Sequence, residues 1–151
     1  MNRRHFLKHT VTAALAAGLV PALLRPSRVM AAWPREAFMA QDAALAWRTL
    51  AGNTEAELSP RVMLDTPARV GSGALVRVGV ATDLDDVQGV TLISDPNPFP
   101  LVANFRLSPR VRGPIVTRIR MGGSGNVVAI VSADGRYFRA QNTVQVATGG
   151  C

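Results

Sequence analysis

The only cysteine of the chain is its last residue, Cys151, and it directly follows Gly149 and Gly150. A structural cysteine usually packs as a small hydrophobe inside a helix or strand. Chain ends fray most readily, and glycine has the greatest conformational freedom of any residue. The sequence therefore predicts a flexible tail that holds a reactive thiol away from the folded domain, as a protein that carries a covalently attached group would need.

The other end of the chain resembles a twin-arginine export signal, whose typical residues here are Arg3, Arg4, Phe6 and Leu7. An apolar run over residues 11–24 follows, and the small side chains around Ala31 suit a signal peptidase. A membrane anchor is the alternative, but the run is shorter than the roughly 20 residues that span a bilayer. We expect residues 1–32 to be cleaved and the protein to be periplasmic, exported by the twin-arginine pathway without a membrane anchor.

Both histidines, His5 and His9, lie within this predicted signal. The rest of the chain then has no histidine and one cysteine, which excludes a Ser-His-Asp or Cys-His catalytic arrangement. It also excludes a zinc site of cysteine and histidine, haem attachment through Cys-x-x-Cys-His and an internal disulfide. We expect a non-catalytic chain with no cofactor and no metal, whose thiol chemistry depends on groups supplied by other proteins.

Most of the net charge also belongs to the signal. The whole chain has a formal net charge of +7, but five of its 17 basic residues precede position 33, which leaves 12 arginines against 10 acidic residues. This small excess gives little support to nucleic-acid binding. Five arginines lie within one short stretch: Arg106, Arg110, Arg112, Arg118 and Arg120. They are interpreted either as solvated strand edges and loops or as a surface for anions or acidic partners.

Residues 33–147 are the size of one domain, and they open with a helical stretch. Pro34 and Glu36 suit a first helical turn, and Gly52 suits its end. The apolar residues expected to share one side of the helix are Phe38, Leu45, Trp47 and Leu50. We expect Trp47 to pack on the domain or on a partner.

Short alternating segments separated by turns then predict strands. The predicted ranges are 61–65, 75–81, 90–94, 101–107, 114–121, 126–132 and 137–147. About seven short strands at this spacing favour an all-β fold, an immunoglobulin-like β-sandwich with an N-terminal helix and a flexible C-terminal tail at residues 148–151. The Cys-Trp-Cys pattern of antibody domains is missing, so the analogy concerns shape alone.

Four connections contain residues that could have a local function. The glycine-rich segment 122–126 lacks the end of a phosphate-binding loop and is predicted to be a hairpin turn, as is Asp134-Gly135. The aspartates around residue 85 do not fit the spacing of a calcium loop, so a solvated turn is the better interpretation. Residues 95–100 contain three prolines and form either a stiff connection or a ridge for docking.

Three segments resemble a known family. They are Asn97-Pro98-Phe99-Pro100 leading to Val102 and Phe105, the strand Val116-Thr117-Arg118-Ile119-Arg120, and the terminal Gly149-Gly150-Cys151. In this order and spacing the chain is similar to SoxY, the substrate-carrying subunit of the SoxYZ sulfur carrier of bacterial thiosulfate oxidation. The resemblance extends over the signal, the helix and the whole β-domain.

The resemblance implies that Cys151 is the site of covalent substrate attachment and that Gly149 and Gly150 are its tether. A c-type haem enzyme of the SoxAX type would conjugate thiosulfate to the thiol. A SoxB-like dimetal hydrolase would remove the terminal sulfonate as sulfate, and a SoxCD-like molybdenum dehydrogenase would oxidise the remaining sulfur. A SoxZ-like subunit without its own signal would be exported in complex with this chain.

The sequence departs from the family at its end, because the family tail reads Gly-Gly-Cys-Gly-Gly and this chain stops at Cys151. Either residues follow Cys151 in the natural protein, or the adjacent terminal carboxylate disfavours the thiolate. Two other functions stay open. One is a secreted β-sandwich binding module that dimerises through its single cysteine. The other is a thiol redox protein, although such proteins usually pair two cysteines.

Overall fold

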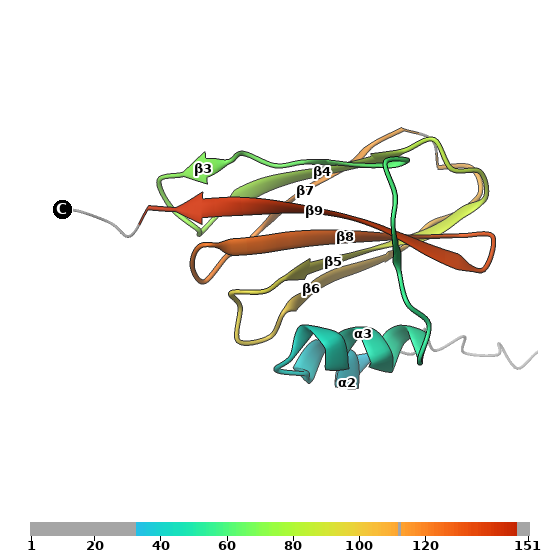
Figure 1. The fold of residues 1–151 in the computed structure, drawn as a ribbon, viewed down its shortest axis with the longest axis horizontal. Coiled ribbons are helices and arrows are strands. Elements are labelled where there is room, and N and C mark those ends of the chain that lie inside the picture. The colour runs from blue at the N-terminus through green and yellow to red at the C-terminus, as the bar shows by residue number, and fades with distance from the viewer. Residues whose placement is uncertain (1–32, 112, 148–151) are drawn as a thin grey trace, which may run out of the picture. The chain divides into compact units, whose positions relative to one another are not determined.

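The computed structural model describes residues 33–111 and 113–147, so the predictions for the signal, for Arg112 and for the tail lie outside the described part. The strands form two sheets (Figure 1). The larger has the order β1-β9-β8-β5-β6, with β3 also paired to β9, and the smaller has the order β2-β4-β7. The strands are β1 (Glu57–Leu58), β2 (Val62–Asp65), β3 (Arg69–Val70), β4 (Val76–Thr82), β5 (Val87–Ser94), β6 (Leu101–Arg106), β7 (Ile115–Ile119), β8 (Gly125–Ala133) and β9 (Arg136–Val146).

All of the strands predicted from the alternating pattern are present, and the predicted β-sandwich is confirmed. Two strands were not predicted, β1 and β3. Each has only two residues, and each pairs in parallel with β9. A segment of this length has no alternation to detect, because its pairing is imposed by the long strand beside it.

The core lies between the two sheets and is built from alternating residues of the facing strands. In β4, Val76, Val78 and Val80 are buried, while Arg77 points outward and is exposed. These valines belong to one cluster with buried residues of the larger sheet: Val90, Leu92, Val127, Ala129, Val131 and Val144. Since successive side chains of a strand point to opposite faces, the same alternation leaves the outer face of the smaller sheet open to solvent.

The predicted helical stretch is present but divided into two helices, α2 (Arg35–Met39) and α3 (Ala43–Ala51). Asp42 is the N-cap of α3, and its side chain accepts a hydrogen bond from the Leu45 backbone N–H at 2.8 Å. Such a cap satisfies one of the N–H groups that have no partner within the helix, so it starts a new helix at this point. Gly52 ends α3 with a φ of 65°, as predicted.

The apolar side of the helices differs from the prediction at one residue. Leu45 is 50% exposed, so its assignment to the buried side was wrong. Phe38, Trp47 and Leu50 do pack against a second hydrophobic cluster, on the outer face of the larger sheet. The buried members of this cluster are Ala37, Ala40, Ala46, Ile93, Leu101 and Ile130. The helices therefore approach the sheet through alanines, which a search for large apolar side chains overlooks.

Trp47 has the packing role that was expected of it. Its indole N–H donates to the Thr54 carbonyl oxygen at 2.9 Å. Its ring meets Tyr137 of β9 edge to face, with ring centroids 4.9 Å apart. The hydrogen bond ties α3 to the loop that follows it. The ring contact holds α3 against the larger sheet, in a geometry that aromatic pairs prefer.

The two predicted hairpin turns have different outcomes. Residues 122–126 connect β7 to β8, but these strands belong to different sheets, so the hairpin prediction was wrong here. Local glycine content does not reveal which strands pair, because pairing depends on the packing of the whole domain. The Asp134-Gly135 turn does join the paired strands β8 and β9, with φ values of 51° and 70°. Positive φ at both central residues is typical of a type I′ hairpin.

The aspartates between β4 and β5 lie in a surface turn. Asp83 pairs with Arg61, with 2.7 Å between Oδ1 and Nε, and both side chains are exposed. In residues 33–111 and 113–147, no three histidine, cysteine or acidic side chains are grouped so that they could hold a metal ion. No helix in this part of the chain is long and apolar enough to cross a membrane.

Candidate functional site

Strand β9 leads to the predicted tail, and its last residues are fixed by β3 on one side. The two strands are parallel, with Arg69 opposite Gln145 and Val70 opposite Val146. The Ala147 N–H donates to the Val70 carbonyl oxygen at 2.9 Å. The last described residue, Ala147, is therefore still part of a hydrogen-bonded ladder.

Ser124 holds the same segment from the other side. Its hydroxyl accepts a hydrogen bond from the Val146 N–H at 2.9 Å and donates one to the Val146 carbonyl oxygen at 3.2 Å. The regular pairing of β8 with β9 has its last register pair at Gly125 and Val144. The serine side chain thus replaces the backbone partner that β9 would otherwise lack, and it extends the fixed part of β9 by two residues.

The loop that carries Ser124 is itself held by Asn97. The Asn97 side-chain N–H donates to the Arg120 carbonyl oxygen at 2.8 Å, and its Oδ1 accepts from the Gly122 N–H at 2.7 Å. A Cβ at Gly122 would lie only 2.9 Å from the Pro96 carbonyl oxygen, closer than real contacts allow. The glycine is needed here for close packing of two loops, rather than for flexibility.

A third loop approaches at Gly73. The Met121 N–H donates to the Gly73 carbonyl oxygen at 2.8 Å, and a Cβ at Gly73 would collide with the Met121 carbonyl oxygen. We call this assembly the tail base, and it consists of Val70–Gly73, Asp95–Asn97, Met121–Gly125 and Val146–Ala147. Its backbone segments are tied together by side-chain and backbone hydrogen bonds, so the tail base is a defined point from which the following residues start.

The tail base also brings together two of the segments that carry the family resemblance. The first begins with Asn97 and the second ends with Arg120, and these two residues are hydrogen-bonded to one another. Sequence reasoning missed this contact and the role of Ser124. Two sequence signals could have revealed the contact. Asn97 precedes a proline, and glycines stand at positions 122 and 125, where any larger side chain would be too close to Pro96.

The residues predicted to act in attachment and export are not described by the structure. Cys151, Gly149 and Gly150 lie outside the described residues, and so do Arg3, Arg4, Phe6 and Leu7. Four of the five clustered arginines are described, and all four are exposed: Arg106, Arg110, Arg118 and Arg120. In the described part of the chain, none of these four side chains forms an ion pair.

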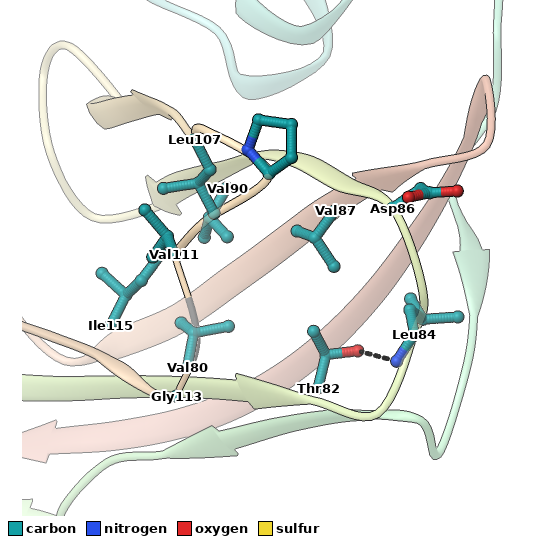
Figure 2. A pocket seen from close by; sticks show the side chains of 11 residues that line it. Val80, Thr82, Leu84, Asp86, Val87, Val90, Leu107, Val111, Gly113 and Ile115 are labelled. Carbon is teal, nitrogen blue, oxygen red and sulfur yellow. Dashed lines mark hydrogen bonds between the residues drawn. The ribbon is translucent and has the colours of Figure 1, made fainter.

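A pocket of about 200 Å³ opens at the opposite end of the sandwich, where β4 ends and β5 begins. Figure 2 shows that its lining is largely aliphatic, with Val80, Val90 and Leu107 facing the same space. The Thr82 hydroxyl is engaged in accepting a hydrogen bond from the Leu84 N–H at 3.2 Å. Among the described lining residues, Asp86 is the only ionisable one, so the lining offers no pair of ionisable groups for acid–base chemistry. The tail base is taken as the candidate site because it leads to Cys151, the predicted attachment residue.

The chain that carries this tail base matches a known protein family over most of its length. A family model described as sulfur oxidation protein SoxY matches residues 47–151, which include α3 from Trp47 on, both sheets and the terminal cysteine. The chain belongs to the SoxY family. Among solved structures it is similar to the sulfur carrier protein SoxY from Chlorobium limicola f thiosulfatophilum, with 29% identity and a TM-score of 0.61. The similarity covers 68% of this chain and 93% of that chain.

A comparison with curated protein sequences finds no match. The family assignment therefore depends on the SoxY family model and on the structural neighbour. Both support a role as a sulfur carrier. Because the SoxY match extends to residue 151, it includes Cys151 as well as the tail base in front of it.

We expect Ser124→Ala to loosen the end of β9 in this SoxY-family chain. The substitution removes both hydrogen bonds to Val146, each of which contributes about 0.5–1.5 kcal/mol. Loss of both bonds removes about 1–3 kcal/mol, so hydrogen exchange of the Val146 amide should accelerate about 5- to 150-fold. Ser108→Ala, at an exposed serine far from the tail base, is the matched control and should leave that amide unchanged. Equal exchange in both variants would contradict the bracing role of Ser124.

Proposed function

We propose that this chain is the substrate-carrying subunit of a periplasmic sulfur carrier, which holds thiosulfate-derived sulfur on Cys151 while separate enzymes act on it. The observation that carries the proposal is the SoxY match through residue 151, with a lone cysteine at its end. The anchored tail base supports it, because a carrier needs a firm starting point for the segment that is presented to an enzyme. In this role the chain is not itself catalytic.

The chemistry that we propose proceeds on the thiol. In the first step the Cys151 thiolate and thiosulfate form an S–S bond, and a c-type haem enzyme of the SoxAX type takes up the two electrons released. In the second step a SoxB-like dimetal hydrolase adds water to the terminal sulfonate, releasing sulfate and leaving a persulfide on the cysteine. A SoxCD-like molybdenum enzyme then oxidises the outer persulfide sulfur to a sulfonate, with oxygen taken from water and the released electrons passed to that enzyme.

The length of the tail sets how deep an active site the thiol could enter. Cys151 is four residues beyond Ala147, the last residue that is hydrogen-bonded to β3. Fully extended, four residues span at most about 14 Å. The two glycines before the cysteine keep this segment narrow, which suits a channel that admits a backbone but few side chains. We therefore propose enzyme active sites that lie within this distance of the surface contacted by the tail base.

We further propose a SoxZ-like partner subunit and export by the twin-arginine pathway. Arg3 and Arg4, followed by an apolar run, support the export route. A twin-arginine signal suits a carrier that leaves the cytoplasm as a folded complex, since the partner subunit would need no signal of its own.

The test is the intact mass of the protein purified from the periplasm of cells grown on thiosulfate, before and after treatment with a reducing agent. We expect a reducible addition of sulfur or thiosulfonate that maps to the peptide containing Cys151, together with a co-purifying second subunit. The same spectrum determines whether residues follow Cys151. An unmodified thiol, or a dimer linked only through Cys151, would refute the carrier and favour the secreted binding module.

A further inference from the structure

The outer face of the smaller sheet carries three arginines, of which Arg118 and Arg120 have no acidic partner among the described residues. Arg118 of β7 lies directly opposite Arg77 of β4, and both side chains point away from the core. Like charges opposite one another destabilise a sheet. Asp65 neutralises Arg77, with 2.6 Å between the charged atoms. Arg118 and Arg120 form no ion pair and no side-chain hydrogen bond with any of the described residues.

The rest of this face has the composition of a contact surface. Val116 precedes Arg118 on the same face of β7 and is 52% exposed, and Met63 of β2 is 54% exposed. The central position is Gly79, which lies opposite both Asp65 and Val116 and leaves the middle of the face flat. Methionine and arginine are enriched in protein–protein interfaces, so the face combines apolar contact area with cationic residues.

The arginines lie at the end of this face that is nearest to the tail. The Arg120 carbonyl oxygen is held by Asn97, within the tail base. Ser124, which binds Val146, is only four residues further along the chain, at most about 14 Å away. A protein that receives the tail must approach this end of the domain, so it comes close to the positive charge of Arg118 and Arg120.

We propose that the face of Met63, Arg77, Val116, Arg118 and Arg120 is a docking surface for an acidic patch around the active-site entrance of the enzymes that process the tail. The proposal rests on the carrier function proposed above. Three arginines are too few for recruitment to an anionic membrane, which takes clusters of about four to eight basic residues. They are also too few for nucleic acid, and residues 33–151 have only a small net positive charge. An acidic protein surface is the partner that fits.

Opposite charges at the edge of an interface mainly increase the association rate, and the gain disappears at high salt. The contact would therefore orient the carrier for a brief encounter without holding it, which suits a protein that visits several enzymes in turn. The apolar residues Met63 and Val116 would add contact area once the charged residues have aligned the two proteins.

The test is the double charge reversal Arg118→Glu with Arg120→Glu, in the full carrier complex loaded at Cys151. The purified dimetal hydrolase of the same bacterium is the probe, assayed at salt concentrations of about 0.01 M and about 0.5 M. We expect KM for the loaded carrier to rise about 10- to 100-fold at low salt, with kcat changed less than about twofold. The difference between variant and wild type should largely disappear at high salt.

The matched control is Arg35→Glu with Arg48→Glu, which changes the net charge equally at exposed positions on the helices. It should change KM less than about twofold. Unchanged KM in the Arg118/Arg120 variant would overturn the docking surface while leaving the carrier function intact. Loss of the co-purifying subunit from this variant would also overturn it, because the face would then belong to the subunit interface. Binding of the wild-type carrier to anionic lipid vesicles that is lost in the variant would overturn it as well. A wild-type carrier that is never loaded would refute the carrier function itself.

Discussion

Cys151→Ser is expected to abolish loading of the carrier and the thiosulfate-dependent production of sulfate by reconstituted enzymes. A serine hydroxyl cannot form the S–S bond through which the sulfur would be held, and the chain has no second thiol to replace it. We expect the loaded fraction to fall below detection, a loss of at least about 1,000-fold. The measurement is the intact mass after incubation with thiosulfate and the haem enzyme.

Folding of this variant can be checked independently of its chemistry. Both hydrophobic clusters are built from residues that the structure describes, between Ala37 and Val146. The melting temperature of Cys151→Ser should therefore equal that of the wild type, and the second subunit should still co-purify. If the serine variant carried the same added mass as the wild type, the sulfur would be attached elsewhere and Cys151 would not be the carrier residue.

Gly73→Ala should have the largest effect on stability among the single substitutions considered. A Cβ at this buried position would collide with the Met121 carbonyl oxygen, a backbone atom that cannot rotate away. Relief of the clash would separate two loops of the tail base and stretch the hydrogen bond from Met121 to Gly73. We expect the free energy of unfolding to fall by about 2–3 kcal/mol. The corresponding loss in melting temperature is roughly 5–15 °C.

Gly71→Ala is the matched control for this prediction. Gly71 is exposed and two residues away, and a Cβ there would meet no atom within 4 Å. The free energy of unfolding of the Gly71→Ala variant should stay within about 0.5 kcal/mol of that of the wild type. Chemical denaturation followed by circular dichroism measures both variants. Equal stability of the two alanine variants would mean that the tail base tolerates a wider separation of its loops.

Much of the fold follows from local sequence in this chain. The strands with alternating side chains, such as β4 with its three buried valines, were predicted because the pattern itself records which face is buried. The pattern is silent on which strands pair. Residues 122–126 were therefore assigned to a hairpin, although β7 and β8 lie in different sheets. Alanines such as Ala46 were overlooked on the helices because a small side chain gives a weak apolar signal.

Only part of the candidate site was predicted from the sequence. The tail was predicted from the single cysteine after two glycines, and it lies outside the described residues, so it stays a prediction. The tail base could not be predicted, because it depends on side chains that bind backbone atoms distant in sequence. Asn97 reaches Gly122 and Ser124 reaches Val146, and neither residue type is unusual in a loop. Their roles become visible only when the sheets bring these loops together.

Strand β9 lies on the outer side of β8 in the larger sheet, and the segment from β1 to β3 passes along its free edge (Figure 1). β1 pairs with β9 at Phe138 and Arg139, and β3 pairs with it at Gln145 and Val146. Between them the Asn142 side chain donates to the Leu64 carbonyl oxygen at 2.7 Å.

An uncovered edge of a long strand is a template on which further chains can add, and such addition leads to aggregation. The two short parallel strands cover this edge at both ends, and Asn142 secures the middle. The longest of the described strands is thus protected from self-association along its outer edge.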